Sequence, residues 1–116
     1  MRLDTIRRGG VATVVLSGEV DAAERTRVAE AVRGLLDQGE TRLVFDCEQV
    51  TFMGSTGIGS LLAARKEALA RSGAMALVRP SPILRKVIRD LGLDAEFPSY
   101  GSREEAEKAV GPPRAP

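Results

Sequence analysis

The chain of 116 residues contains no histidine, no tryptophan and a single cysteine. Without histidine it cannot form a Ser-His-Asp or Cys-His catalytic site, an HExxH zinc site or any other metal centre ligated by imidazole. A single cysteine, Cys47, allows neither an internal disulfide nor a CxxC redox pair. It follows the apolar run Leu43-Val44-Phe45, which predicts a small residue at a strand end rather than a reactive thiol. We therefore expect no catalytic residue, no metal, no cofactor and no enzymatic activity.

Strong net charge and long apolar runs are also missing. Seventeen basic and sixteen acidic residues leave a formal charge of +1, so no strong overall field attracts nucleic acid or an anionic membrane. No apolar run approaches the roughly 20 residues that span a bilayer. The first ten residues lack the apolar core of a secretory signal. These features predict a cytoplasmic setting, without membrane insertion or direct nucleic-acid binding.

The charge that is present is unevenly distributed. Residues 17–50 contain four basic and eight acidic residues, whereas residues 51–89 contain seven basic and one acidic residue. Two interpretations remain open at this point. The two segments can form solvated helix faces of opposite sign, or they can form a polarised surface that orients a protein partner.

Short β-type runs alternate with amphipathic helical runs along the chain. Strands are predicted over 5–8, 12–16, 41–45, 74–78 and 95–97, and helices over 21–38, 60–71, 82–91 and 102–110. Gly9-Gly10 suits a tight antiparallel hairpin between the first two strands. The alternation predicts one α/β domain over 1–110, with helices packed against a mixed four- to five-stranded sheet. Residues 111–116 predict a flexible tail, because Gly-Pro-Pro-Arg-Ala-Pro cannot continue a helix.

Three helix starts are marked by capping residues. Asp21 and Glu24 have the spacing of a capping box in which Asp replaces Ser or Thr, and Ser102 with Glu105 has the same spacing. Ser81-Pro82 combines an N-cap serine with proline in the first helical position.

The segment Gly54-Ser55-Thr56-Gly57-Ile58-Gly59 is predicted as a loop before a helix, and its composition is not that of a core. A phosphate-binding P-loop is a poor match, because the lysine after the last glycine is missing. A nucleophile elbow fails as well, because the GxSxG spacing is wrong and no histidine exists to activate the serine. What remains is a hydroxyl at a helix N-terminus, where Ser55 or Thr56 either caps the helix or is a target for modification.

Six blocks, in order along residues 5 to 110, resemble the anti-sigma factor antagonists of the STAS domain family. The first resembles that family's "GELD" turn, the second its third strand, and the third its "DSSGLG" signature; the remaining blocks resemble later parts of the pattern. The blocks are Ser17-Gly18-Glu19-Val20-Asp21, Leu43-Val44-Phe45-Asp46 with Val50-Thr51-Phe52-Met53, Gly54-Ser55-Thr56-Gly57-Ile58-Gly59, Gly73-Ala74-Met75, Pro80-Ser81-Pro82 with Leu84-Arg85, and Leu91-Gly92-Leu93.

The resemblance implies a function based on partner switching. In that family the antagonist binds an anti-sigma factor that is also a serine kinase, and so frees the sigma factor; phosphorylation by that kinase ends the binding, and a phosphatase resets it. Carried over by position, Ser55 is the implied phosphorylation site. The implied partner-binding residues are Asp21, Gly54, Ser55, Thr56 and Gly57.

One position departs from the family pattern. Gly54 stands where the family has an Asp before the phosphoacceptor, and that acid could orient the hydroxyl or contact the kinase. The departure keeps a second function open, that of a STAS scaffold or regulatory subunit of a transport or signalling complex that is not phosphorylated.

Overall fold

The computed structural model describes residues 1–112, so residues 113–116 of the expected tail lie outside the described residues. Its elements alternate between strand and helix in the order expected for an α/β domain. They are β1 (Arg2–Arg8), β2 (Val11–Val20), the 3₁₀ turn η1 (Ala22–Glu24), α1 (Arg25–Asp37), β3 (Arg42–Met53), α2 (Ser55–Ala70), β4 (Ala74–Val78), α3 (Pro82–Asp90), β5 (Ser99–Tyr100) and α4 (Arg103–Val110).

The strands form one five-stranded mixed sheet in the order β1-β2-β3-β4-β5. The β1 strand is antiparallel to β2, and the other three neighbouring pairs are parallel. Gly9 and Gly10 form the tight hairpin turn with φ of +59° and +79°, a conformation that glycine adopts without strain. The predicted fold class and hairpin are confirmed.

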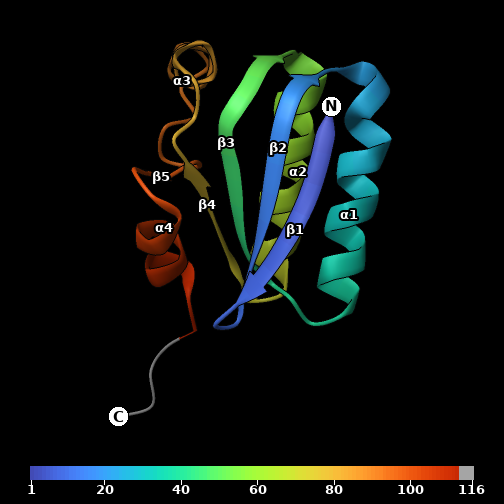
Figure 1. Ribbon diagram of the computed structural model, residues 1–116, viewed down its shortest axis with the longest axis vertical. Helices are drawn as coiled ribbons and strands as arrows, with labels where there is room; N and C mark the ends of the chain where they lie inside the picture. Colours follow the sequence, from blue (N-terminus) through green and yellow to red (C-terminus); the bar gives the residue numbers. More distant parts are fainter. Residues whose placement is uncertain (113–116) are drawn as a thin grey trace.

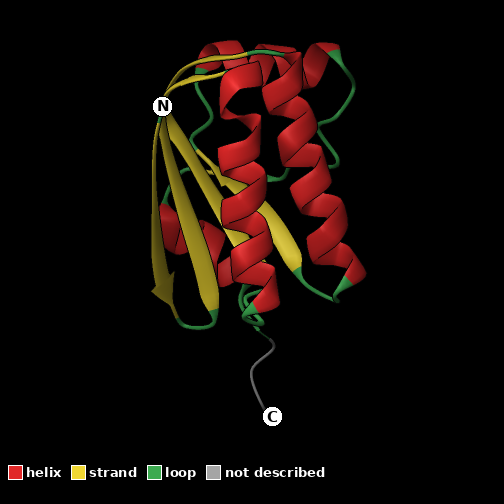
Figure 2. Ribbon diagram, turned by 90° about the vertical axis from the view of Figure 1, so that its right-hand side faces the viewer, coloured by secondary structure: helices red, strands yellow, loops and turns green. Residues whose placement is uncertain are grey.

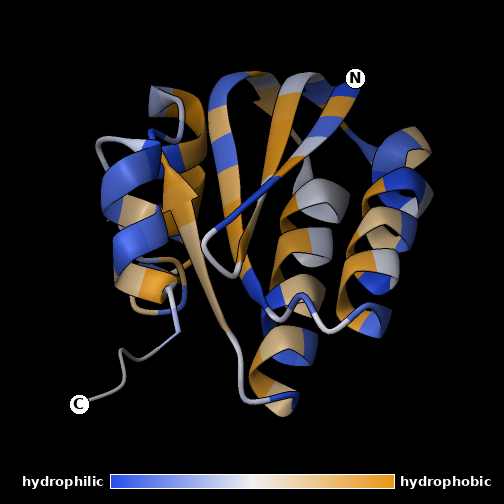
Figure 3. Cartoon of the chain, turned by 60° about the horizontal axis from the view of Figure 1, so that its bottom comes forward, coloured by the Kyte–Doolittle hydropathy of each residue, from blue (hydrophilic) through white to orange (hydrophobic). Residues whose placement is uncertain are grey.

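Helices cover both faces of the sheet. The helices α1 and α2 run side by side along one face, whereas α4 lies on the other (Figures 1 and 2). Alternate side chains of β3 serve the two faces, since Leu43 and Phe45 join the core beneath α1, α2 and α3, and Val44 joins the smaller core beneath α4. The α4 helix is mostly hydrophilic and contributes only Ala106 and Val110 to that smaller core (Figure 3).

Three predicted boundaries are wrong. The third strand continues from the predicted end at residue 45 to Met53, because its second half pairs in parallel with 17–20 of β2. The second helix begins at Ser55 rather than at residue 60, so the expected loop is its first turn. Residues 95–97 form a turn, in which Phe97 packs into the core, and the last strand is Ser99–Tyr100 beside β4.

The end of the described chain is attached to the sheet. The guanidinium of Arg42 donates to the carbonyl oxygens of Val110 and Gly111 at 2.9 and 3.2 Å. The boundary of the domain at residue 110 stays a prediction. No helix within residues 1–112 is both long and apolar enough to cross a membrane.

Candidate partner-binding and modification site

The carboxyl ends of β2 and β3 meet at one edge of the sheet, at the top of Figure 1. Val20 and Met53 are paired there, and the backbone N–H of Gly54 donates to the carbonyl oxygen of Val20 at 3.1 Å. The chain therefore leaves both strands at the same place. This pairing brings Asp21 and the Gly54-Ser55 segment, which are far apart in the sequence, to one surface.

Ser55 occupies the first position of α2 and is exposed. The N-cap residue is Gly54, which offers no side-chain acceptor to the helix. Among residues 1–112 the hydroxyl groups of Ser55 and Thr56 make no hydrogen bond. The backbone carbonyl of Thr56 accepts from the hydroxyl of Ser60 at 3.1 Å. The interpretation of Ser55 or Thr56 as a helix cap is therefore wrong, and the Ser55 hydroxyl is free at the surface.

Gly57 is buried beneath this surface, where α2 meets the strand ends. A Cβ atom at this position would lie 2.7 Å from Cγ of Met53 and 2.8 Å from the carbonyl oxygen of Val20. Only glycine permits so close an approach. A Cβ at Gly59, two residues further along the helix, would meet nothing within 4 Å, so Gly57 and Gly59 have different roles. Gly57 therefore allows the first turn of α2 to rest directly on the strand ends.

Phe52 lies beside the helix start and was not singled out from the sequence. Its side chain is 48% exposed, and its Cε2 atom lies 3.4 Å from where a Cβ of Gly54 would stand. That spacing leaves room for a side chain at Gly54. The sequence contained a signal for this exposed aromatic residue, because Phe52 next to Met53 interrupts the polar-apolar alternation at the end of β3.

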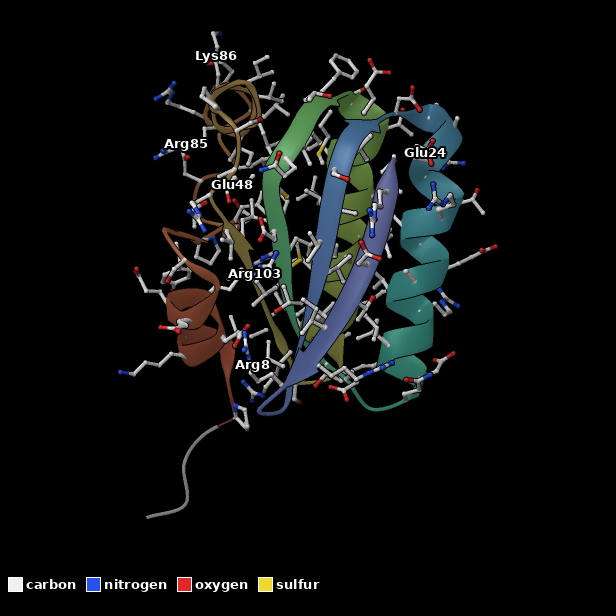
Figure 4. The ribbon with its side chains drawn as sticks, viewed as in Figure 1. Arg8, Glu24, Glu48, Arg85, Lys86 and Arg103 are labelled. Carbon is white, nitrogen blue, oxygen red and sulfur yellow. The ribbon has the colours of Figure 1, made fainter. Side chains whose placement is uncertain are left out.

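Asp21 is the N-cap of the 3₁₀ turn η1, and its carboxylate accepts from the N–H of Ala23 at 3.1 Å. The predicted cap is confirmed, but the reciprocal half of the capping box is wrong. The carboxylate of Glu24 faces Arg27 at 3.1 Å and the N-terminal ammonium at 3.8 Å instead (Figure 4). Met1, which precedes β1, therefore lies close to this turn.

A groove of about 900 Å³ runs between α1 and α2 and reaches the first turn of α2 at Thr56 and Gly59. Ion pairs cross between the two helices further along, from Arg33 to Glu67 at 3.0 Å and from Arg71 to Asp37 at 3.3 Å. The part of the groove beside Thr56 and Gly59 is therefore not crossed by these ion pairs.

The remaining candidates for chemistry are structural. Cys47 is fully buried within β3 rather than at a strand end, and burial, with a smaller contribution from Asp46, raises the pKa of its thiol to about 12. Asp46 is buried as well and accepts from Arg103 at 2.6 Å and from the N–H of Glu48 at 3.1 Å. Within residues 1–112 no three histidine, cysteine, aspartate or glutamate side chains gather as a metal site would need.

Residues 2–106 match the model of the STAS domain. The chain belongs to the STAS domain family. This STAS domain is 31% identical over 101 residues to the anti-sigma-F factor antagonist RsfB of Mycobacterium tuberculosis, with 87% of this chain and 82% of that protein covered. The resemblance stated from the sequence is confirmed.

Solved structures of similar proteins have the same fold as this chain. This STAS domain superposes with a TM-score of 0.76 on the phosphorylated form of the Bacillus cell fate determinant SpoIIAA, at 27% identity, covering 94% of this chain and 99% of that one. An anti-sigma factor antagonist from Mycobacterium paratuberculosis gives a TM-score of 0.81 at 28% identity, covering 94% and 92% of the two chains. RsfB and the Mycobacterium paratuberculosis protein are both named as anti-sigma factor antagonists.

Proposed function

We propose that this STAS domain is an anti-sigma factor antagonist. It binds an anti-sigma factor that has serine kinase activity and thereby releases a sigma factor in the cytoplasm. Phosphorylation of Ser55 ends the binding, and a phosphoserine phosphatase restores it. The observation that carries the proposal is the exposed Ser55 hydroxyl at the start of α2, which makes no hydrogen bond within residues 1–112.

The proposed switch needs only local electrostatics. A phosphate adds about −1.5 to −2 charge at pH 7. At the first position of α2 the N–H groups of the first turn and the helix dipole favour that charge, so the phosphorylated domain stays folded. An interface fitted to a neutral hydroxyl must desolvate the same charge without a partner for it. The expected result is a loss of about a factor of 10² in affinity.

The neighbouring residues take supporting roles in the proposal. Asp21, Gly54 and Thr56 form the rim around Ser55 that the partner contacts, since the pairing of β2 with β3 brings them to one edge. Gly57 acts from below, because it lets the first turn of α2 rest on Val20 and Met53.

A second candidate is a STAS scaffold or regulatory subunit of a transport or signalling complex, without phosphorylation. Gly54 favours this candidate, because it replaces the acid that precedes the phosphoacceptor in the family. A side chain at Gly54 would meet only the ring of Phe52, at an ordinary 3.4 Å contact. Packing therefore does not require glycine at this position, which is compatible with the second candidate.

Capture from the native cell extract distinguishes the two candidates. The tagged protein is expected to retain an ATPase-type serine kinase, and the purified kinase is then bound to its sigma factor and titrated with this protein. Release of the sigma factor supports antagonism. Capture of a membrane transporter subunit, with no sigma factor released in the titration, would support the scaffold instead.

A further inference from the structure

The α3 helix exposes one large apolar side chain and several basic side chains to solvent. Leu84 and Ile88 are buried, whereas Ile83 on the outward half is 57% exposed. Arg85 and Arg89, which are four residues apart, lie together on the other flank of the buried stripe, and Lys86 lies between that flank and Ile83. Arg85 and Lys86 both point away from the sheet (Figure 4). We call Ile83, Arg85, Lys86 and Arg89 the α3 surface.

Within the described residues, two of its three cations form no ion pair with an acidic side chain. Lys86 pairs with Asp90 at 2.7 Å, and the hydrogen bond from Lys86 lowers the pKa of that carboxyl. Within residues 1–112 no carboxylate lies within 4 Å of the guanidinium of Arg85 or of Arg89, although Arg79 on the preceding turn is paired with Glu48 at 3.4 Å. The uncompensated charge of the α3 surface therefore resides on two arginines one helical turn apart.

Both arginines line a cavity of about 230 Å³ between α3 and the segment that leads to β5. Ser99 contributes to the same wall, and Asp94 lines it too without reaching ion-pair distance of either guanidinium. With two positive groups and one negative group, the cavity keeps an excess of positive charge. A recess of this size accepts one carboxylate side chain, and guanidinium groups bind carboxylates with two parallel hydrogen bonds.

We propose that the α3 surface docks an acidic segment of the partner protein, with a carboxylate between Arg85 and Arg89. The identity of the partner rests on the proposed function, but the chemistry of the docked segment does not. Nucleic acid fits less well, because no exposed aromatic side chain belongs to the α3 surface for bases to stack on. An anionic bilayer fits less well, because such binding uses clusters of about four to eight lysines and arginines.

A peptide titration tests the docking without any partner protein. The probe is a 14-residue helical peptide with glutamate and leucine alternating on one face, and the matched control peptide has lysine in place of each glutamate. We expect amide chemical-shift changes in ¹⁵N-labelled protein around α3 with the acidic peptide alone, and their loss in Arg85→Glu/Arg89→Glu. Changes centred elsewhere, or unaffected by the double variant, would overturn the proposal. The proposal would also be overturned if the acidic peptide does not bind but phosphatidylglycerol–phosphatidylcholine vesicles or single-stranded DNA do, and the double variant abolishes that binding.

A second titration uses the anti-sigma factor. Arg85→Glu/Arg89→Glu should weaken binding at least tenfold, whereas Arg85→Lys/Arg89→Lys should fall between the wild type and the reversal. Lys66→Glu/Lys108→Glu, at two exposed positions on α2 and α4, is the matched control and should bind as the wild type does. Melting temperatures establish that each variant is folded.

The two tests separate the failures of the two proposals. Equal binding of the wild type and Arg85→Glu/Arg89→Glu to the anti-sigma factor would overturn docking at α3 and leave antagonism standing. If the wild type does not bind an anti-sigma factor at all, antagonism fails, and the peptide titration still decides what the α3 surface recognises.

Discussion

The starts of α2 and α4 each have a serine, and the two serines are used differently. In α4 the N-cap Ser102 accepts from the N–H of Glu105 at 3.1 Å, and Ser81 caps α3 through Leu84 in the same way at 3.4 Å. In α2 the N-cap is Gly54, and Ser55 stands one position later without any such bond. A shift of one residue relative to the helix start thus decides whether a serine hydroxyl stabilises the fold or stays free for another molecule.

The start of α2 is held by its backbone and by packing instead of by a side-chain cap. The N–H of Gly54 donates to Val20, and the carbonyl of Gly54 accepts from the N–H of Ile58 at 3.0 Å. Ile58 and Gly57 are buried against the strand ends. Because these contacts fix the first turn, the Ser55 hydroxyl has no structural task.

Replacing the buried glycine should have the largest effect. Gly57→Ala places a methyl group 2.8 Å from the carbonyl oxygen of Val20, which cannot move aside easily, so we expect a loss of about 2 kcal/mol or more in the free energy of unfolding. Gly59→Ala is the matched control, since its methyl group meets open space and alanine favours helix by about 0.5–1 kcal/mol. Urea denaturation measures both. Equal effects of the two substitutions would show that the contact at Val20 does not hold the helix start.

Removing the two serine hydroxyls should separate the capped helix from the uncapped one. Ser102→Ala should lower the free energy of unfolding by about 1 kcal/mol, because the N–H of Glu105 loses its acceptor. Ser55→Ala should change it very little. A loss in Ser55→Ala as large as that in Ser102→Ala would show that the Ser55 hydroxyl caps α2.

Replacing Asp21 probes the part of the candidate site that lies at the end of β2. Asp21→Ala removes the acceptor for the N–H of Ala23 and should cost about 1 kcal/mol of stability in urea denaturation. We also expect weaker binding of the anti-sigma factor than the lost stability explains. Asp21→Asn retains an N-cap acceptor and is the control. A folded Asp21→Ala protein with unchanged affinity would remove Asp21 from the interface.

Gly54→Asp should have the smallest effect on stability and a clear effect on phosphorylation. The site has room for the side chain, and Asp at an N-cap is better than Gly by only a few tenths of a kcal/mol. An acid beside Ser55 can orient its hydroxyl for transfer, so the rate of phosphorylation by the cognate kinase should rise. A rate that is unchanged or lower would show that the missing acid is irrelevant in this chain.

Periodicity located the elements whose buried side chains repeat regularly. The helix with Val28, Val32 and Leu35 and the helix with Leu84 and Ile88 were both predicted, because these side chains form one buried stripe. The second half of β3 was missed, since exposed Glu48, Gln49 and Thr51 conceal a strand whose order comes from backbone pairing with β2. The start of α2 was missed for the related reason that packing overrides the low helix propensity of its glycines.

The candidate site was predicted only in part. Ser55 and Asp21 were chosen through the family resemblance, and the geometry adds that the Ser55 hydroxyl is free and that Gly57 is buried. The excess of positive charge over 51–89 was visible in the sequence. The sequence does not show which arginines in this segment lack an acidic partner, because ion pairs such as Arg79–Glu48 join segments that are distant in the chain.

The proposed switch is tested by measuring the affinity of the anti-sigma factor for this protein with and without phosphate on Ser55. The phosphorylated form is made with the kinase and ATP and verified by peptide mapping, and Ser55→Ala serves as the form that cannot be modified. We predict equal binding of the unmodified protein and Ser55→Ala, and binding about 10² weaker for phosphorylated Ser55. Phosphate found on Thr56 instead, or equal affinity of the phosphorylated and unmodified forms, would contradict the account.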